Sequence, residues 1–302
     1  MNAGELPMIA FTVLAQMSVG AFVVLGIVNV VGRLRGYSTA VLDEVSDPGA
    51  YAIGGTLVLG LIASMFHIHD VFNVMNVLRH VDSSWLSREI VAGMAFAAAG
   101  FVYAACQLRS WGSPGFRQAV ALVAAVLGVV LVWCMSMVYY SLTTVPAWNT
   151  WLGAFAIGAA FMTTIMLRRH GGAVGEKLGP AQASPADGEL ILSALRWIAV
   201  AGVVLLGAQF VMQPMHLTNL MNAGQVGIES AHAFSGGLNV VRIILLVLGA
   251  GVVSLFLFRL ASKPEATERP VAALVTVAFV CVLAAEFLGR AQFYEQMIRI
   301  GM

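Results

Sequence analysis

Eight apolar stretches, each long enough to cross a lipid bilayer, are the feature that most limits what this chain can fold into. A transmembrane helix needs about 20 predominantly apolar residues. Only helices and closed barrels satisfy the backbone inside lipid. The chain is therefore predicted to be an all-α polytopic membrane protein in which residues 1–302 form a single domain of eight transmembrane helices. The approximate ranges of these stretches are 8–31, 49–66, 87–108, 117–140, 148–168, 190–212, 237–258 and 270–290.

Turn-forming residues separate the apolar stretches. Examples are Asp47-Pro48-Gly49, Ser113-Pro114-Gly115, Val145-Pro146 and the segment from Lys263-Pro264 to Arg269-Pro270. The longest connection, 169–189, is rich in Gly, Pro, Ala and Ser and is predicted to be a surface linker. No internal repeat is visible.

Composition supports a membrane location and excludes several function classes. Of the 302 residues, 60% are hydrophobic and 10% are charged, whereas a soluble domain carries about 25% charged residues. The net charge of +1, without a basic patch, argues against a nucleic-acid partner. Cys106, Cys134 and Cys281 are isolated and form no Cys-x-x-Cys pair, so we expect neither a zinc site nor an iron–sulfur cluster in this chain.

The distribution of Lys and Arg predicts the orientation. One set of connections carries 11 of them and the other carries 5. The richer set is predicted to face the cytoplasm, so both termini would face outward, to the periplasm of a Gram-negative cell. The first Lys or Arg is Arg33, so the first stretch is expected to be a retained helix rather than a signal peptide.

Ionisable residues gather on the predicted outward side, which makes that side the candidate functional site, because such residues are expensive at a membrane edge. His67 ends the second stretch, with Asp70 three residues later, close enough to orient an imidazole. Arg88 and Glu89 begin the third stretch. A neutral imidazole accepts a proton from a bound phenol and a carboxylate passes it on, which suits the oxidation of a quinol.

A second group of charges lies in the last two stretches. Glu286 and Arg290 are four residues apart, the favourable order for a helical ion pair. They either neutralise each other or polarise the same pocket. Arg242, near the start of the seventh stretch, either shares that pocket or extends its charged head to the membrane interface.

Three other functions remain open on the residues alone. A haem would need two facing histidines, and His67 with His216 is the one pair at similar depth. A His-x-His metal site at His67 and His69 lacks further ligands, so we assign no metal site. A transporter or proton channel predicts ionisable residues near the bilayer midplane and an internal repeat.

Several motifs make the chain similar to the membrane anchor subunits of dimethyl sulfoxide reductase-type complexes. They are Ile62-Ala63-Ser64-Met65-Phe66-His67, Leu86-Ser87-Arg88-Glu89-Ile90, Val138-Tyr139-Tyr140-Ser141, Thr144-Val145-Pro146-Ala147-Trp148, and Ala285-Glu286-Phe287-Leu288-Gly289-Arg290 with Phe293-Tyr294. The spacing from His67 to Glu89 matches the histidine and glutamate of that family. After the histidine the family tends to have Gly, Pro and Arg, whereas this chain has His69, Val71 and Asn73.

The resemblance implies an eight-helix subunit of the cell inner membrane that binds menaquinol, or another quinol, near its periplasmic face. It also implies an anchor without a redox cofactor of its own, neither haem nor iron–sulfur cluster. Its partners would be an iron–sulfur electron-transfer subunit and a molybdopterin catalytic subunit. By this resemblance, His67 and Glu89 would be the catalytic quinol-site residues. From their positions in the sequence, Asp70, Arg88, Glu286 and Arg290 are the further candidates for quinol binding. A purely structural anchor without a quinol site is the alternative.

Overall fold

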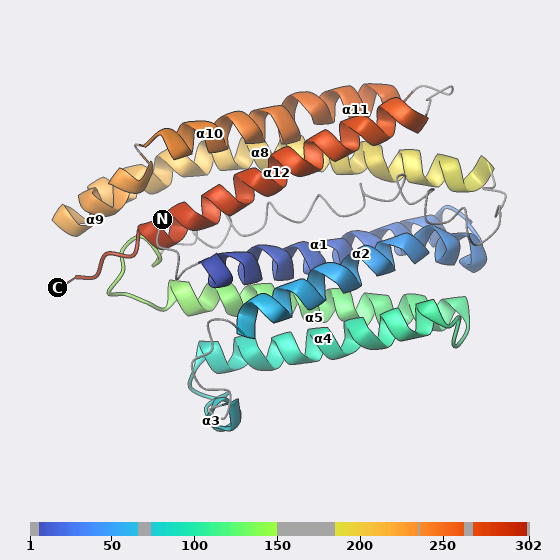
Figure 1. The fold of residues 1–302 in the computed structure, drawn as a ribbon, viewed down its shortest axis with the longest axis horizontal. Coiled ribbons are helices and arrows are strands. Elements are labelled where there is room, and N and C mark those ends of the chain that lie inside the picture. Colours follow the sequence, from blue (N-terminus) through green and yellow to red (C-terminus); the bar gives the residue numbers. More distant parts are fainter. Residues whose placement is uncertain (1–5, 66–73, 150–184, 235, 263–267, 301–302) are drawn as a thin grey trace.

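The computed structural model describes residues 6–65, 74–149, 185–234, 236–262 and 268–300, and within these ranges it contains helices and no strand (Figure 1). The all-α prediction is therefore confirmed for the described residues. The helices are α1 (Leu6–Leu34), α2 (Thr39–Met65), α3 (Val74–Arg79), α4 (Trp85–Leu108), α5 (Pro114–Tyr140), α8 (Pro185–Met221), α9 (Gly224–Ala231), η5 (His232–Phe234), α10 (Gly237–Leu246), the π-helical η6 (Val247–Val253), α11 (Ser254–Ala261) and α12 (Glu268–Glu295).

Six helical spans in the described ranges are long and apolar enough to cross a membrane. They lie at the first, third, fourth, sixth, seventh and eighth predicted stretches, and run over Leu6–Leu34, Trp85–Leu108, Pro114–Tyr140, Leu192–Met221, Gly237–Leu260 and Ala273–Glu295. The second predicted stretch lies within α2, whose segment Gly54–Ala63 is a shorter apolar helix. Residues 150–168 of the fifth stretch and 169–184 of the linker lie outside the described residues, so the total of eight spans stays a prediction. The linker prediction is wrong for residues 185–189, which form the first turns of α8.

Two helices continue past points where the sequence predicted a break or an end. The turn predicted at Asp47-Pro48-Gly49 is wrong, because α2 begins at Thr39 and runs through it. Its first turns are held against α1: Leu42 is fully buried against Gly32, and Ser46 accepts a hydrogen bond from Asn29 Nδ2 at 3.4 Å. This packing compensates for the hydrogen bond that a proline removes. Similarly, α8 runs to Met221, beyond the predicted end at 212, with Pro214 inside it.

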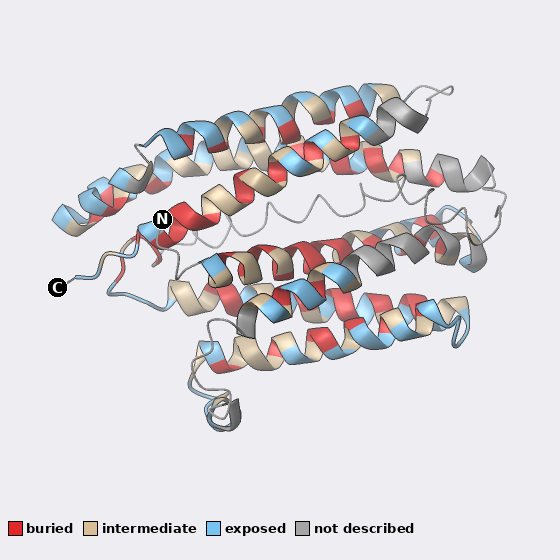
Figure 2. Cartoon of the chain, in the orientation of Figure 1, coloured by how far each residue is buried: buried red, intermediate tan, exposed pale blue. Residues whose placement is uncertain are grey.

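The helices form two layers (Figure 1). In one layer, α1 packs against α2 and α5, and α4 packs against α5. The other layer contains α8, α10, η6, α11 and α12, and α12 contacts α1. Figure 2 shows that α1 is largely buried, whereas the outer helices expose many side chains. The exposed side chains of the outer helices include large apolar residues such as Val126 and Phe256, as expected for a surface that faces lipid.

The first layer has a close-packed centre around Phe22. Its ring meets the rings of Phe96 and Tyr103 edge to face, with centroids 5.6 and 5.5 Å apart. Gly128 of α5 lets α1 approach, because a Cβ there would lie 2.7 Å from Val19 Cγ1. Small residues at such positions allow membrane helices to pack closely.

Gly128→Val is expected to destabilise the protein by about 1–3 kcal/mol, because the added side chain overpacks the contact between α1 and α5. Gly207→Val is the matched control, since Gly207 is exposed and a Cβ there meets no atom within 4 Å. The free energy of unfolding of both variants, measured in mixed micelles, checks this packing. Equal stability of the two variants would contradict it.

The beginning of α1 and the end of α12 lie at the same end of the bundle, which we call the site end (Figure 1). The side of the membrane that the site end faces stays a prediction. The turns from α1 to α2 and from α4 to α5 lie at the opposite end.

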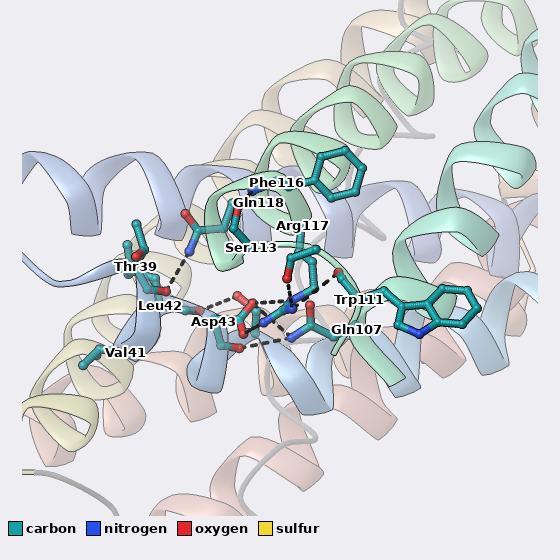
Figure 3. Close-up of polar contacts among 12 residues, drawn as sticks. Thr39, Val41, Leu42, Asp43, Gln107, Trp111, Ser113, Phe116, Arg117 and Gln118 are labelled. Carbon is teal, nitrogen blue, oxygen red and sulfur yellow. Dashed lines mark hydrogen bonds and ion pairs between the residues drawn. The ribbon is translucent and has the colours of Figure 1, made fainter. Parts of the chain in front are cut away.

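A polar network fixes the helices at the opposite end (Figure 3). Arg117 of α5 forms an ion pair with Asp43 of α2, and its Nη1 donates a hydrogen bond to Gly112 O at 2.9 Å. Gln107 Nε2 of α4 donates to Asp43 Oδ1 at 3.3 Å. Ser113 caps α5, because its Oγ accepts a hydrogen bond from Phe116 N.

Candidate functional site

Two of the predicted site residues, His67 and Asp70, lie outside the described residues, as do His69 and Asn73. The other four lie on two helices: Arg88 and Glu89 on α4, and Glu286 and Arg290 on α12. All four are near the site end. The structure therefore describes the half of the predicted site that is formed by these two helices.

The start of α4 is fixed by a side-chain cap, which sets the position of Glu89. Ser84 has an extended backbone and its Oγ accepts a hydrogen bond from Ser87 N at 3.4 Å. Arg88 reaches back to the preceding loop, where its Nε donates to Val81 O at 2.8 Å and its guanidinium lies 4.3 Å from the centre of the Trp85 ring. Arg88 thus holds the loop before α4, and its role in quinol binding stays a prediction.

Glu89 is half-buried and is electrostatically coupled to Arg290 of α12. Glu89 also interacts electrostatically with Cys134 and Tyr139 of α5 and with Tyr294 of α12. Glu89 belongs to α4, and these neighbours belong to α5 of the same layer and α12 of the other. Glu89 therefore faces the junction between the two layers. The structure thus brings together Glu89 and Arg290, which are far apart in the sequence.

Arg290 connects Glu89 with a deeper group of charges. Arg290 Nη2 donates a hydrogen bond to Gln16 Oε1 of α1 at 3.2 Å, and its guanidinium lies 5.1 Å from the centre of the Phe293 ring. Glu286 lies one turn before Arg290 on α12. It interacts electrostatically with both Arg242 and Arg290, and more strongly with Arg242. The charge of Glu286 is therefore balanced by two arginines, Arg242 as well as the Arg290 that the spacing suggested.

Arg242 is buried, which rules out the alternative that it reaches the membrane interface. It is 6% exposed and packs against Gly289, where an added Cβ would lie 2.6 Å from Arg242 Nε. Gln209 of α8 joins it to Glu286: Arg242 Nη2 donates to Gln209 Oε1 at 3.4 Å, and the Gln209 side chain is hydrogen-bonded to Glu286.

Glu89, Arg242, Glu286 and Arg290 together form what we call the charge cluster. Two carboxylates and two guanidinium groups give a formal charge of zero, and Arg242, Glu286 and Arg290 are each 6% exposed. Ionisable residues inside a membrane are costly, and they are a functional-site hypothesis by default. Charge balance lowers that cost, because each charge has an opposite charge close by.

An aromatic group lies beside the charge cluster at the site end. Tyr139 and Tyr294 share a hydrogen bond of 2.8 Å between their hydroxyl groups. The Trp148 ring stacks on Phe293 with centroids 5.3 Å apart, and Trp148 Nε1 donates to Phe293 O at 2.8 Å. These contacts join the end of α5 and the segment after it to α12.

His216, the second histidine of the haem alternative, is buried near the end of α8. Its Nε2 lies 3.2 Å from Gln296 Oε1, and its ring meets Phe234 edge to face. Its proposed counterpart His67 is outside the described residues. The structure therefore gives no distance between the two.

Gln16 and Gln209 belong to the site although neither was a candidate on sequence grounds. Each is a polar amide within an apolar stretch, which is the signal that points to them. Nothing in the sequence indicates which partner they meet, because Gln16 and Arg290 are 274 residues apart.

Comparisons with known proteins identify the family of the chain. The family model described as DMSO reductase anchor subunit (DmsC) matches residues 1–295. The chain belongs to the DMSO reductase anchor subunit family.

Curated members of the DMSO reductase anchor subunit family are similar over nearly their whole length. One of them, a subunit of the anaerobic dimethyl sulfoxide reductase of Escherichia coli (strain K12), is 32% identical over 300 residues, covering 99% of this chain and 96% of that protein. The subunit of the same name from Haemophilus influenzae is 29% identical over 306 residues, covering 100% and 99%. No solved structure matches the sequence. The family and the apolar helices identify a multi-pass membrane anchor subunit.

Proposed function

We propose that this anchor subunit oxidises a quinol within the membrane of a molybdoenzyme complex. Family membership supports an anchor for partner subunits, and the names of the curated relatives support a reductase complex. The observation that carries the quinol site is the half-buried carboxylate of Glu89 at the site end, coupled to Arg290 inside a membrane-spanning bundle. A structural anchor has no need of such a group in lipid.

Quinol oxidation requires proton acceptors at the ring and an electron acceptor outside this chain. A quinol releases two protons and two electrons and becomes a quinone. In the proposed mechanism, His67 accepts or hydrogen-bonds one quinol hydroxyl, with Asp70 beside it, and Glu89 passes the proton to the outward side. The electrons pass to an iron–sulfur partner subunit and from it to a molybdopterin catalytic subunit. The quinol is menaquinol or another quinol that enters laterally from the bilayer.

The membrane arrangement that goes with this proposal has eight spans in the inner membrane, with both termini in the periplasm. The partner subunits then lie on the periplasmic face, at the site end. Protons released from the quinol at the site end then leave on the periplasmic side. The chain contributes the quinol oxidation site, whereas the terminal reduction takes place in the molybdopterin subunit.

Binding of a fluorescent hydroxyquinoline inhibitor to membranes that contain the complex tests the proposal. Wild type is expected to bind one inhibitor per complex, and His67→Ala and Glu89→Ala are expected to weaken binding at least tenfold, while the complex still assembles. Glu229→Ala is the matched control, because Glu229 is an exposed carboxylate on α9.

Each other outcome of that titration contradicts the proposal in a different way. Equal binding by wild type and all variants would mean that the site lies elsewhere. No binding by any of them would favour a purely structural anchor.

A further inference from the structure

Three buried polar atoms around the charge cluster lack a hydrogen-bond partner within the part of the chain that the structure describes. They are Gln16 Nε2, Arg242 Nε and Glu286 Oε1, from three different helices. Each of these residues is at most 6% exposed. An unsatisfied polar group in a low-dielectric interior is costly, and each such group in a native structure calls for a partner.

The chemistry of these atoms is specific. Arg242 Nε and Gln16 Nε2 are donors, and the Glu286 carboxylate is an acceptor. A hydroxyl group both donates and accepts, so it can donate to Glu286 while it accepts from Arg242. A carbonyl oxygen only accepts, so it makes fewer of these bonds.

The cluster is also placed to reach the same ligand as Glu89. Arg290 acts on both Glu89 and Glu286. Glu286 lies one helical turn from Arg290, a rise of about 5.4 Å along α12. A quinol carries its two hydroxyl groups at opposite ends of one ring, so a ring with one hydroxyl near Glu89 would extend its other hydroxyl along α12 toward Glu286.

We infer that Arg242 and Glu286, with Gln16 beside them, form a subsite that binds the second hydroxyl group of the quinol, the one not handled by His67 and Glu89. This inference rests on the proposed function. On oxidation, the proton of that hydroxyl passes to the Glu286 carboxylate and leaves through Glu89, while the electrons pass to the partner subunit and the hydroxyl becomes a carbonyl. The site is selective for the redox state, because this carbonyl cannot donate a hydrogen bond to Glu286 once the carboxylate has released the proton. The quinone product is then held less tightly than the quinol and leaves the site.

The test uses a soluble naphthoquinol and the two naphthols that each lack one of its hydroxyl groups, bound to the purified complex under anaerobic conditions. In wild type, loss of either hydroxyl is expected to weaken binding roughly 10- to 100-fold, as for a hydrogen bond to a charged group. In the double variant Arg242→Met with Glu286→Leu, removing the hydroxyl that binds at the subsite should weaken binding less than about threefold. Removing the other hydroxyl should weaken binding as much as it does in wild type. Removing both charges together keeps the buried charge balanced, which protects folding.

Two further variants sharpen the test. Asp43→Leu combined with Arg117→Met makes the same kind of charge-balanced change at the opposite end, and it should bind all three probes as wild type does. Gly289→Ala keeps every charge but displaces Arg242 Nε. In this variant, removing the hydroxyl that binds at the subsite should therefore weaken binding less than it does in wild type.

The outcomes separate the two proposals. Suppose that wild type binds the naphthoquinol, and that removal of either hydroxyl weakens binding by the variant with Arg242→Met and Glu286→Leu as much as it weakens binding by wild type. In that case the subsite is wrong and the quinol site stands. If wild type does not bind the naphthoquinol at all, the proposed function fails and the subsite fails with it.

Discussion

Glu89→Gln is expected to lower the rate of quinol oxidation by the complex by about 10²- to 10⁴-fold, the usual contribution of a positioned general base. Glutamine keeps the size of the side chain and still accepts a hydrogen bond, but it takes up no proton. Binding of a quinol analogue should therefore change little, and the loss should appear in turnover.

The structure adds a reason to expect that the variant folds. Glu89 is half-buried, so the amide remains partly accessible to polar neighbours. Arg290 keeps its hydrogen bond to Gln16 and its interaction with Glu286. The charge cluster then carries one unbalanced positive charge, shared between Arg242 and Arg290.

Steady-state oxidation of a naphthoquinol by membranes with the intact complex measures the effect, with Glu229→Gln as the control. Glu229 is exposed and accepts a hydrogen bond from Gln225 Nε2, so its variant should turn over as wild type does. A Glu89→Gln complex with more than a third of wild-type turnover would remove Glu89 from the proton path.

The spans were predictable because their signal is local: about 20 apolar residues in a row suffice. The boundaries were less predictable where tertiary packing decides them. Pro48 reads as a break, yet Leu42 and Ser46 hold the start of α2 against α1, and the helix continues. The break at Ser113-Pro114-Gly115 was predictable because these turn-forming residues follow one another, and α5 begins there at Pro114.

The candidate site was predictable in part, for a similar reason. Glu286 and Arg290 stand out in the sequence because they lie four residues apart on one helix. Which groups they meet depends on how the two layers pack. Glu286 interacts more strongly with Arg242 than with Arg290, and Arg290 donates a hydrogen bond to Gln16. Such contacts join distant parts of the chain, and no spacing in the sequence encodes them.

Arg117→Met is expected to destabilise the protein by about 3 kcal/mol, because it leaves the Asp43 carboxylate without its cation. The Arg117 and Asp43 side chains are 7% and 15% exposed. Breaking a buried ion pair by removing one partner costs about 3–5 kcal/mol, and the partial exposure of Asp43 places the effect at the lower end.

The structural reason for so large an effect is that this pair joins several segments at once. Asp43 belongs to α2 and Arg117 to α5, and Arg117 also donates to Gly112 O in the turn after α4 (Figure 3). Gln107 of α4 donates to the same carboxylate. Without the guanidinium, the amide of Gln107 is left as a weaker donor to a full negative charge.

Replacing both partners, by Asp43→Leu together with Arg117→Met, should restore most of the stability, because no uncompensated charge remains. The free energy of unfolding of wild type, Asp43→Leu, Arg117→Met and the double variant, from denaturant titration in mixed micelles, gives the coupling between the two residues through a double-mutant cycle. If the double variant is as unstable as the sum of the single variants, the two side chains do not act as a pair. Each side chain would then stabilise the opposite end through its other contacts, such as the hydrogen bond from Arg117 to Gly112 O, rather than through the ion pair.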